Sequence, residues 1–332
     1  AQIPQVSFPN LPPKLYSSPI YIKNLNIETG ASLFLNGQEF IVDEVVSNEG
    51  TIELIGNEPT PSFGTYDVDS GRFSYVGNGD DQPDEFTIFD FGEVDYYDLS
   101  INDSTRRDVF IKQDDHALSI VHNLNVTIGT LDISQNNNTL IIAEAGTLIV
   151  DGGTLIADEA TLDVNGSVVI SNGNFSAPGD GQSFTVAKDW TFLGGNFNPN
   201  NGRVIFDSSA QTVFTGNATF YNIRSYEYGK IFKFTPGSVQ TVEGTFDFRG
   251  GPQVNQKISL LSVSEGDTWD IKFPYGEQGV QYLKVQDSNA LENDITCFSC
   301  TNLLNNNELW LFFALQMNVP APNRTIDRTP TI

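Results

Sequence analysis

The chain has 332 residues, of which 18% are charged and 11% aromatic, and it contains 17 Lys plus Arg against 42 Asp plus Glu. The resulting net charge of −25 repels nucleic-acid phosphates and acidic lipid surfaces, and no apolar run approaches the ~20 residues of a membrane-spanning helix. We therefore expect neither nucleic-acid binding nor membrane insertion, whereas divalent cations suit such an excess of carboxylates.

Residues 1–19 precede the first expected strands and contain five prolines, which lack the N–H that a central strand needs. We expect an extended N-terminal tail that docks either on the chain's own fold or on a neighbouring copy, with Ile3, Val6 and Phe8 as candidate contacts. The chain starts at Ala1 without an initiator Met, which a removed signal peptide would explain. The sequence thus predicts an exported protein, extracellular or at the cell surface.

Residues 20–312 alternate short β-branched runs with Gly, Asn, Thr, Ser and Asp, a pattern typical of a turn-rich β protein. The clearest stretch runs from Gly146 to Ser171, where an apolar residue recurs every seven positions, at Leu148, Leu155, Leu162 and Val169. A coiled coil is excluded because Gly and Asn interrupt the stretch and a second apolar seam is missing.

Short strands explain the same stretch better. Alternation within each strand predicts the following inward pairs: Leu148 and Val150, Leu155 and Ala157, Leu162 and Val164. No such strand buries a face alone, so successive coils of about 20 to 25 residues must stack into a tube. The fold expected is an all-β parallel β-helix (β-solenoid).

An acidic loop, Gly77 to Glu85, interrupts the repeats. Asp80, Asp81, Asp84 and Glu85 gather oxygen ligands of the kind that calcium prefers. The loop follows neither the EF-hand nor the nonapeptide calcium pattern, so a solvated acidic loop is the alternative. We expect no required cofactor, with calcium as the one candidate ion.

Asp114, Asp115 and His116, with His122 nearby, are the residues that would suit acid–base chemistry on a sugar. Acidic residues are scattered over turns throughout the chain, and no spacing singles out a carboxylate pair. We therefore expect no catalytic site, and a carbohydrate-active enzyme is the third choice of function.

Two further groups of residues suit contact with sugars. Several aromatic residues could form a sugar-binding or subunit-binding strip or belong to the core: Tyr96, Tyr97, Phe220, Tyr221, Tyr226 and Tyr228. Seven N-x-S/T sequons permit glycosylation without demonstrating it, at Asn102, Asn125, Asn137, Asn165, Asn174, Asn217 and Asn323.

Two diverged copies of one multi-coil module are visible, at about 70–133 and 201–312. The first contains Ser70–Tyr75, Tyr96–Ile101 and Gly129–Ile133; the second contains Asn201–Phe206, Gln211–Phe214, Phe220–Ile223 and Gln240–Phe248. The second copy ends with Ser264–Trp269, Tyr282–Ser288 and Asn307–Phe312.

These segments resemble repeat modules of large bacterial surface and extracellular proteins, whose pattern runs G-x-V-x-F, Q-T-[IV], FYNL, Q-T-V-x-G-T, S-x-x-G-x-x-W, Y-x-x-V-x-D-S and N-x-x-W-x-F. The resemblance covers residues 201–312 well and 70–133 loosely. It implies a parallel β-helix and a surface or matrix location, and it implies no catalytic residue. With the general rule for parallel crossovers, it also predicts a right-handed coil.

The only two cysteines, Cys297 and Cys300, are spaced for a disulfide, a redox pair or half of a metal site. Zinc would need the two histidines, which lie far away in sequence, and a redox motif would need a helix that the sequence does not predict. We expect a local disulfide formed in an oxidising compartment.

Residues 313–332 are expected to form a C-terminal strand and a tail with three prolines, in which Leu315, Val319 and Ile326 are candidate subunit contacts. An open solenoid leaves unpaired strand edges at both ends, which must be capped or paired. We therefore predict a structural subunit that assembles with itself into an extracellular filament, sheath or surface layer through its ends and tails. A glycan-binding surface adhesin is the alternative.

Overall fold

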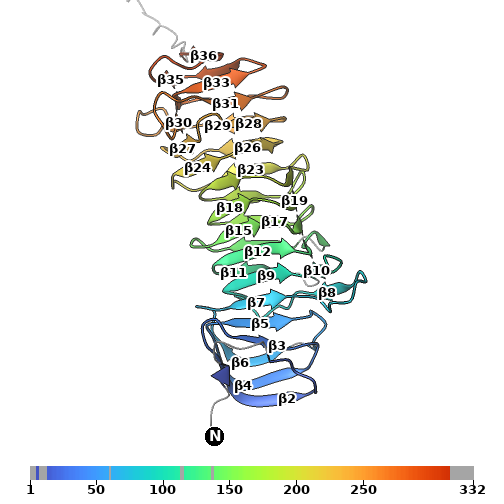
Figure 1. Ribbon diagram of the computed structural model, residues 1–332. Coiled ribbons are helices and arrows are strands. Elements are labelled where there is room, and N and C mark those ends of the chain that lie inside the picture. The colour runs from blue at the N-terminus through green and yellow to red at the C-terminus, as the bar shows by residue number, and fades with distance from the viewer. Residues whose placement is uncertain (1–4, 7–12, 60, 113–115, 136–137, 315–332) are drawn as a thin grey trace, which may run out of the picture.

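The computed structural model describes residues 5–6, 13–59, 61–112, 116–135 and 138–314, which form a parallel β-solenoid of about 12 turns. This described part contains 36 strands and no α-helix, and its paired strands run parallel. The turns stack along one axis, from the N-terminal turns at the bottom of Figure 1 to β36 (Trp310–Phe313) at the top. The predicted all-β solenoid is confirmed.

Two sheets dominate the N-terminal turns. Sheet A has the order β1 (Gln5–Val6), β2 (Ile20–Ile27), β4 (Phe40–Asn48) and β6 (Ser62–Tyr66). Sheet B follows the whole tube as β3 (Ser32–Phe34), β5 (Thr51–Leu54), β7 (Arg72–Tyr75), β9 (Asp98–Asn102), β12 (Asn123–Ile128), β15 (Thr147–Val150), β18 (Ser167–Ile170), β21 (Trp190–Phe192), β24 (Thr212–Thr215), β27 (Ile231–Phe234), β30 (Ile258–Ser262), β32 (Leu283–Val285) and β35 (Thr301–Asn302).

Four further sheets complete the walls. Sheet C contains β8 (Glu85–Thr87), β10 (Val109–Ile111), β13 (Thr130–Asp132), β16 (Thr154–Ile156), β19 (Asn174–Ser176) and β22 (Asn196–Asn198). Sheet D contains β11 (Leu118–Ile120), β14 (Thr139–Ile142), β17 (Thr161–Val164), β20 (Phe184–Val186), β23 (Arg203–Phe206), β26 (Asn222–Ser225) and β29 (Phe246–Phe248). Sheet E contains β25 (Ala218–Phe220), β28 (Val239–Val242), β31 (Trp269–Lys272) and β33 (Ser288–Leu291), and sheet F contains β34 (Ile295–Phe298) and β36.

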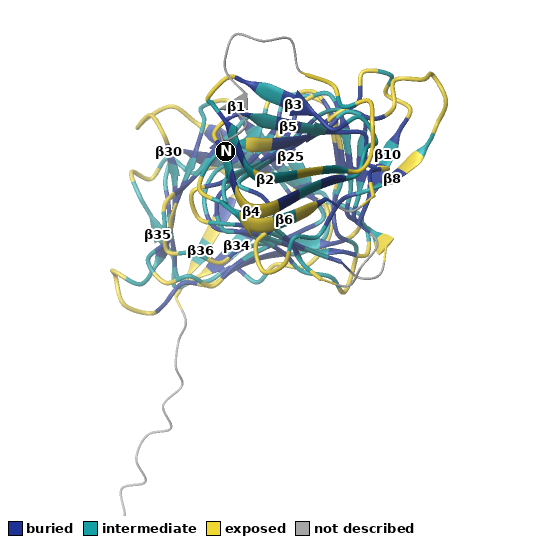
Figure 2. Cartoon of the chain, turned by 90° about the horizontal axis from the view of Figure 1, so that it is seen from below, coloured by how far each residue is buried: buried dark blue, intermediate teal, exposed yellow. Residues whose placement is uncertain are grey.

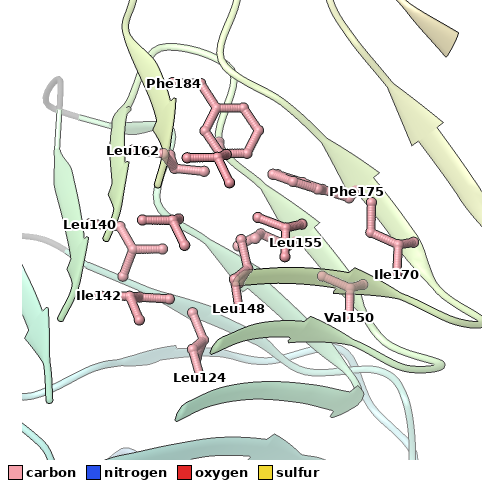
Figure 3. Close-up of a cluster of buried hydrophobic side chains, with 14 of the residues drawn as sticks. Leu124, Leu140, Ile142, Leu148, Val150, Leu155, Leu162, Ile170, Phe175 and Phe184 are labelled. Atoms are coloured by element: carbon pink, nitrogen blue, oxygen red, sulfur yellow. The ribbon is translucent and has the colours of Figure 1, made fainter. Parts of the chain in front are cut away.

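The core consists of columns of apolar side chains, one from each turn. Leu140, Leu162 and Phe184 occupy equivalent positions of three successive turns of sheet D, and all three lie inside the tube (Figure 3). Burying each such side chain stabilises the fold by about 1.5–3 kcal/mol. The six predicted inward residues are all fully buried, at Leu148, Val150, Leu155, Ala157, Leu162 and Val164.

The seven-residue recurrence fails at its last member. Val168 and Ile170 are the buried residues of β18, and Val169 between them faces outward. Val168 follows Val164 by four positions, whereas Leu155 follows Val150 and Leu162 follows Ala157 by five, so the buried residue of β18 falls one position early. The spacing of seven therefore reflects turn length and not a helical period.

Tight stacking of the turns requires glycine at two neighbouring levels. A Cβ atom on Gly166 would lie 1.7 Å from the carbonyl oxygen of Gly146, and one on Gly146 would lie 1.9 Å from the carbonyl oxygen of His122. Any side chain at either position would displace the turn below.

The first segments of the two predicted module copies pair with later segments in the same way, but the two pairs lie in different sheets. Arg72 of β7 pairs with Asp98 of β9, and Arg203 of β23 pairs with Asn222 of β26 in the same register. The first pair lies in sheet B and the second in sheet D. The last segment of the first copy, Gly129–Ile133, forms β13 in sheet C, whereas Gln240–Phe248 of the second copy contributes to β28 in sheet E and forms β29 in sheet D.

The chain's own N-terminal segment covers part of the first turn. β1 pairs with Asn26 and Ile27 of β2, and Lys14 bridges to Phe34 of β3. Figure 2 views the tube from this end, with β2, β4 and β6 crossing the face. Of the predicted contacts in this tail, Val6 therefore pairs within its own chain, whereas Ile3 and Phe8 lie outside the described residues.

Candidate functional site

The outer wall at the C-terminal end is apolar. Phe298 of β34 and Leu311 and Phe313 of β36 point away from the core and are 43%, 40% and 50% exposed. Phe298 and Phe313 are register partners whose ring centroids lie 6.1 Å apart. We call these three residues the C-terminal wall. Exposed apolar side chains that are contiguous mark contact surfaces.

The motif residues behind this wall hold the last turns together. The indole N–H of Trp310 donates to Ser288 Oγ at 3.1 Å, and that of Trp269 donates to the carbonyl oxygen of Gln286 at 3.1 Å. Asn307 Oδ1 accepts the main-chain N–H of Ser288 at 2.9 Å. Buried indole N–H groups need such partners, so the motifs that carry the family resemblance serve architecture here.

Cys297 and Cys300 are joined by a disulfide bond, as the sequence predicts. Cys297 is buried in β34, and Cys300 Sγ accepts the main-chain N–H of Leu283 at 3.2 Å. The bond closes the turn between sheets F and B directly below the C-terminal wall. The predicted contacts Leu315, Val319 and Ile326 lie outside the described residues.

The acidic loop does not gather its four carboxylates around one point. Asn78 Nδ2 donates to Asp80 Oδ2 at 3.0 Å and to Asp84 Oδ2 at 2.7 Å, whereas Asp81 forms an ion pair with Arg107 at 3.0 Å. Glu85 is exposed at the start of β8. Among the described residues, no group of three or more His, Cys, Asp or Glu side chains is arranged to hold a metal ion. Calcium binding stays a prediction.

Two buried aspartates of the next turn were not predicted from the sequence, and one of them, Asp108, holds the base of this loop. Asp108 Oδ1 accepts the main-chain N–H of Asp84 at 3.2 Å. Asp103 accepts the N–H groups of Thr105 and Arg107, each at 2.9 Å. Both aspartates are buried, and burial raises the pKa of Asp108. Asp108 reaches Asp84 across the stack, 24 residues away, whereas the partners of Asp103 lie two and four residues after it in the sequence.

The two histidines pair with different carboxylates. His116 Nδ1 and Lys112 Nζ each lie 3.3 Å from Asp90 Oδ2, beside a hollow of about 380 Å³. His122 Nδ1 lies 3.0 Å from Asp98 Oδ1, and its ring stacks on Tyr97. Asp114 and Asp115 lie outside the described residues, so the absence of catalysis stays a prediction.

The predicted aromatic strip divides between core and surface. Tyr96 and Phe220 are fully buried, Tyr97 and Tyr221 are half-buried, and only Tyr226 and Tyr228 are exposed. Tyr226 donates to Asp247 Oδ2. Four of the six residues therefore serve the core or the wall, and no continuous aromatic strip forms.

Lys230 is a buried cation that composition did not reveal. Its Nζ donates to the carbonyl oxygens of Ser208 at 2.6 Å and Ala210 at 2.7 Å, and burial lowers its pKa to about 8. It lies below an open hollow of about 550 Å³ whose lining includes both residues. The hydrogen-bonding capacity of the Lys230 ammonium group is thus used by main-chain carbonyl groups, and Lys230 stabilises the turn that contains Ser208 and Ala210.

A polar groove of about 520 Å³ crosses the outer face of sheet B. Its lining comes from five successive turns and consists of Arg72, Ser100, Asn102, Arg106, Asn125, Thr127, Ile128, Asp151, Gly152 and Asn172. Two of the predicted sequon asparagines, Asn102 and Asn125, are among them. We call this feature the sheet B groove.

No helix among the described residues is long and apolar enough to cross a membrane. Comparisons with models of known protein families, with curated proteins and with solved structures found no match for this chain. The structure thus establishes the fold. The comparisons do not show membership of the surface-protein family that the sequence resembles.

Proposed function

We propose that this chain is a structural subunit of an extracellular or cell-surface assembly, in which copies join end to end. The observation that carries the proposal is the C-terminal wall, where three large apolar side chains, two of them register partners, lie exposed on the two strands of sheet F. The disulfide supports an oxidising location outside the cell. The resemblance to bacterial surface modules supports the same location.

The segment that follows the wall has the composition of a docking strand. Leu315, Met317 and Val319 alternate with Gln316 and Asn318, so an extended segment would carry one apolar face. Residues 315–332 contain two Arg and one Asp, a net charge of 2 − 1 = +1. Residues 1–314 hold the other 15 basic and 41 acidic residues, a net charge of −26. Charge complementarity therefore favours docking of this segment on a solenoid.

The first turn of the next copy supplies the receiving edge. β1 pairs only with Asn26 and Ile27, and the outer edge of β2 over residues 20–24 pairs with none of the described residues. Ile20 and Ile22 on this strand are only half-buried. Addition of a strand to such an edge provides main-chain hydrogen bonds and covers apolar side chains. Because the two surfaces differ, the contact is heterologous and propagates a filament.

The test replaces the apolar face of the segment in the full chain. We expect light scattering and electron microscopy to show concentration-dependent linear polymers of the parent protein. The triple variant Leu315→Ser, Met317→Ser and Val319→Ser should stay monomeric. The matched control Gln316→Ser and Asn318→Ser changes the opposite face and should polymerise. A circular dichroism spectrum rich in β structure must be common to all three.

Two results would contradict the proposal at different points. If the parent protein stays monomeric at every concentration, the proposal of end-to-end assembly is wrong. Polymers of the triple variant that equal those of the parent show that the joint lies elsewhere.

A second candidate function, glycan binding, is favoured by the sheet B groove. Its polar side chains line a concave surface of the side wall, away from the proposed joint.

A further inference from the structure

The sheet B groove contains hydrogen-bonding groups that the protein itself does not use. Within the described part of the chain, the side chains of Arg72, Asn102, Arg106, Asn125 and Asn172 form no hydrogen bond or ion pair. Each amide and guanidinium offers several donors. The groove therefore presents two guanidinium groups and three amides to solvent.

Several outward polar side chains elsewhere on the tube are satisfied between turns. Serine or threonine hydroxyls donate to carboxylates one turn away, as in Thr29 to Glu49 at 3.0 Å, Ser176 to Asp158 at 2.6 Å and Thr185 to Asp163 at 3.0 Å. Such ladders stiffen a wall and leave little for a ligand. The contrast marks the groove as a surface suited to recognition.

The groove also carries a positive net charge, whereas the molecule as a whole is strongly negative. Arg72, Arg106 and Asp151 are its charged lining residues, giving a local charge of 2 − 1 = +1 on a chain of net −25. Arg107, the neighbour of Arg106, is paired with Asp81. A guanidinium without a carboxylate partner can bind a ligand carboxylate through two parallel hydrogen bonds.

We propose that the sheet B groove binds an oligosaccharide that contains carboxylate-bearing sugars, with Arg72 and Arg106 holding carboxylates and Asn102, Asn125 and Asn172 bonding hydroxyls. The groove crosses five turns, so at about 4.8 Å per turn it runs for roughly 19 Å, which suits a short extended chain. This binding is independent of the proposed end-to-end assembly.

The negative charge of the rest of the molecule limits the ligand. At physiological ionic strength the Debye length is about 8 Å, so carboxylates beyond the groove are largely screened. A short acidic oligosaccharide can therefore bind at the local positive charge, whereas a long polyanion would extend over acidic surface. We expect modest affinity per subunit, raised by avidity where many copies line one assembly.

The test is calorimetric titration of the full chain, produced in a host without N-glycosylation so that Asn102 and Asn125 stay unmodified. The probes are tetragalacturonate and its fully methyl-esterified form, which keeps the hydroxyl groups and removes the charge. We expect tetragalacturonate to bind at least about tenfold more tightly than the ester. Arg72→Gln should weaken tetragalacturonate binding by about tenfold.

Lys272→Gln is the matched control, because it removes one positive charge from a partly exposed side chain of sheet E, outside both the groove and the proposed joint. It should change binding less than about twofold. Equal losses in Arg72→Gln and Lys272→Gln would overturn the assignment of the site. Equal binding of acid and ester would overturn the role of the guanidiniums, and no heat of binding up to about 10 mM ligand would overturn the proposal as a whole.

Discussion

The middle turns and the last turns of the tube are built from the same strands but differ in how they are covered. Leu140 and Leu162 in the middle have a turn above and a turn below, and both are fully buried. In β36, Phe312 points inward yet stays partly exposed, because no described strand follows β36 in sheet F. A solenoid turn thus gains much of its burial from its neighbours and loses that share at an end.

The largest expected effect comes from truncating one leucine in each of these two regions. Leu162→Ala should destabilise the middle turns by about 2–5 kcal/mol, because the buried site leaves a cavity. Leu311→Ala on the C-terminal wall should cost no more than about 0.5 kcal/mol. Hydrogen exchange of the strands that flank each site gives both values. Equal losses at the two sites would show that the ends are covered as well as the middle.

A smaller effect comes from pH and separates the early turns from the last ones. Asp95 is fully buried, and burial raises its pKa to about 6 despite N–H groups donated by Ser119 and Phe91. The folded state thus binds this proton more readily than the unfolded state. The associated stability is present below about pH 4 and is lost as pH rises through 6, by up to about 3 kcal/mol.

The measurement is hydrogen exchange between pH 4 and 7, corrected for the intrinsic exchange rate. Protection around β9 and β11 should fall with rising pH, whereas β34 and β36 should not follow this titration. Asp95→Asn cannot ionise and should abolish the change between pH 4 and 6. An unchanged slope in this variant would assign the effect to other carboxylates.

The smallest expected effect is confined to the last turns. Reducing the disulfide between Cys297 and Cys300 opens a very short loop, worth about 2 kcal/mol in the chain-entropy model. We expect faster exchange in β34 and β36 and no change in the middle turns, measured with and without reductant. The double variant Cys297→Ser and Cys300→Ser should reproduce the reduced state and be insensitive to reductant. Loosening of the middle turns would contradict the comparison.

Strand alternation was enough to predict the fold and the inward residues Leu148, Leu155 and Leu162. It was not enough to predict which residues meet across turns, because turn length varies. Thr147 pairs with Ser167, 167 − 147 = 20 residues away, whereas Ile231 pairs with Ser259, 259 − 231 = 28 residues away. This variation explains why the phase error at Val169 went unseen.

The candidate sites were harder to predict for the same reason. Asp108 meets the acidic loop only through stacking, and the sheet B groove draws on five turns. The C-terminal wall had a local signal, since the run Trp310 to Phe313 lacks the polar alternation of the other strands. An unbroken apolar run in a short strand indicates that both of its faces need cover.

The parallel stacking of sheet B from β3 to β35 fixes the length of the molecule. The 13 strands of sheet B are separated by 13 − 1 = 12 steps of about 4.8 Å, which hold its first and last strands roughly 55–60 Å apart. Duplicating or deleting one turn would change this separation by a single fixed step while leaving the surfaces at either extremity intact. Spacing along an array of such subunits can therefore be set by counting turns, independently of how the subunits are joined.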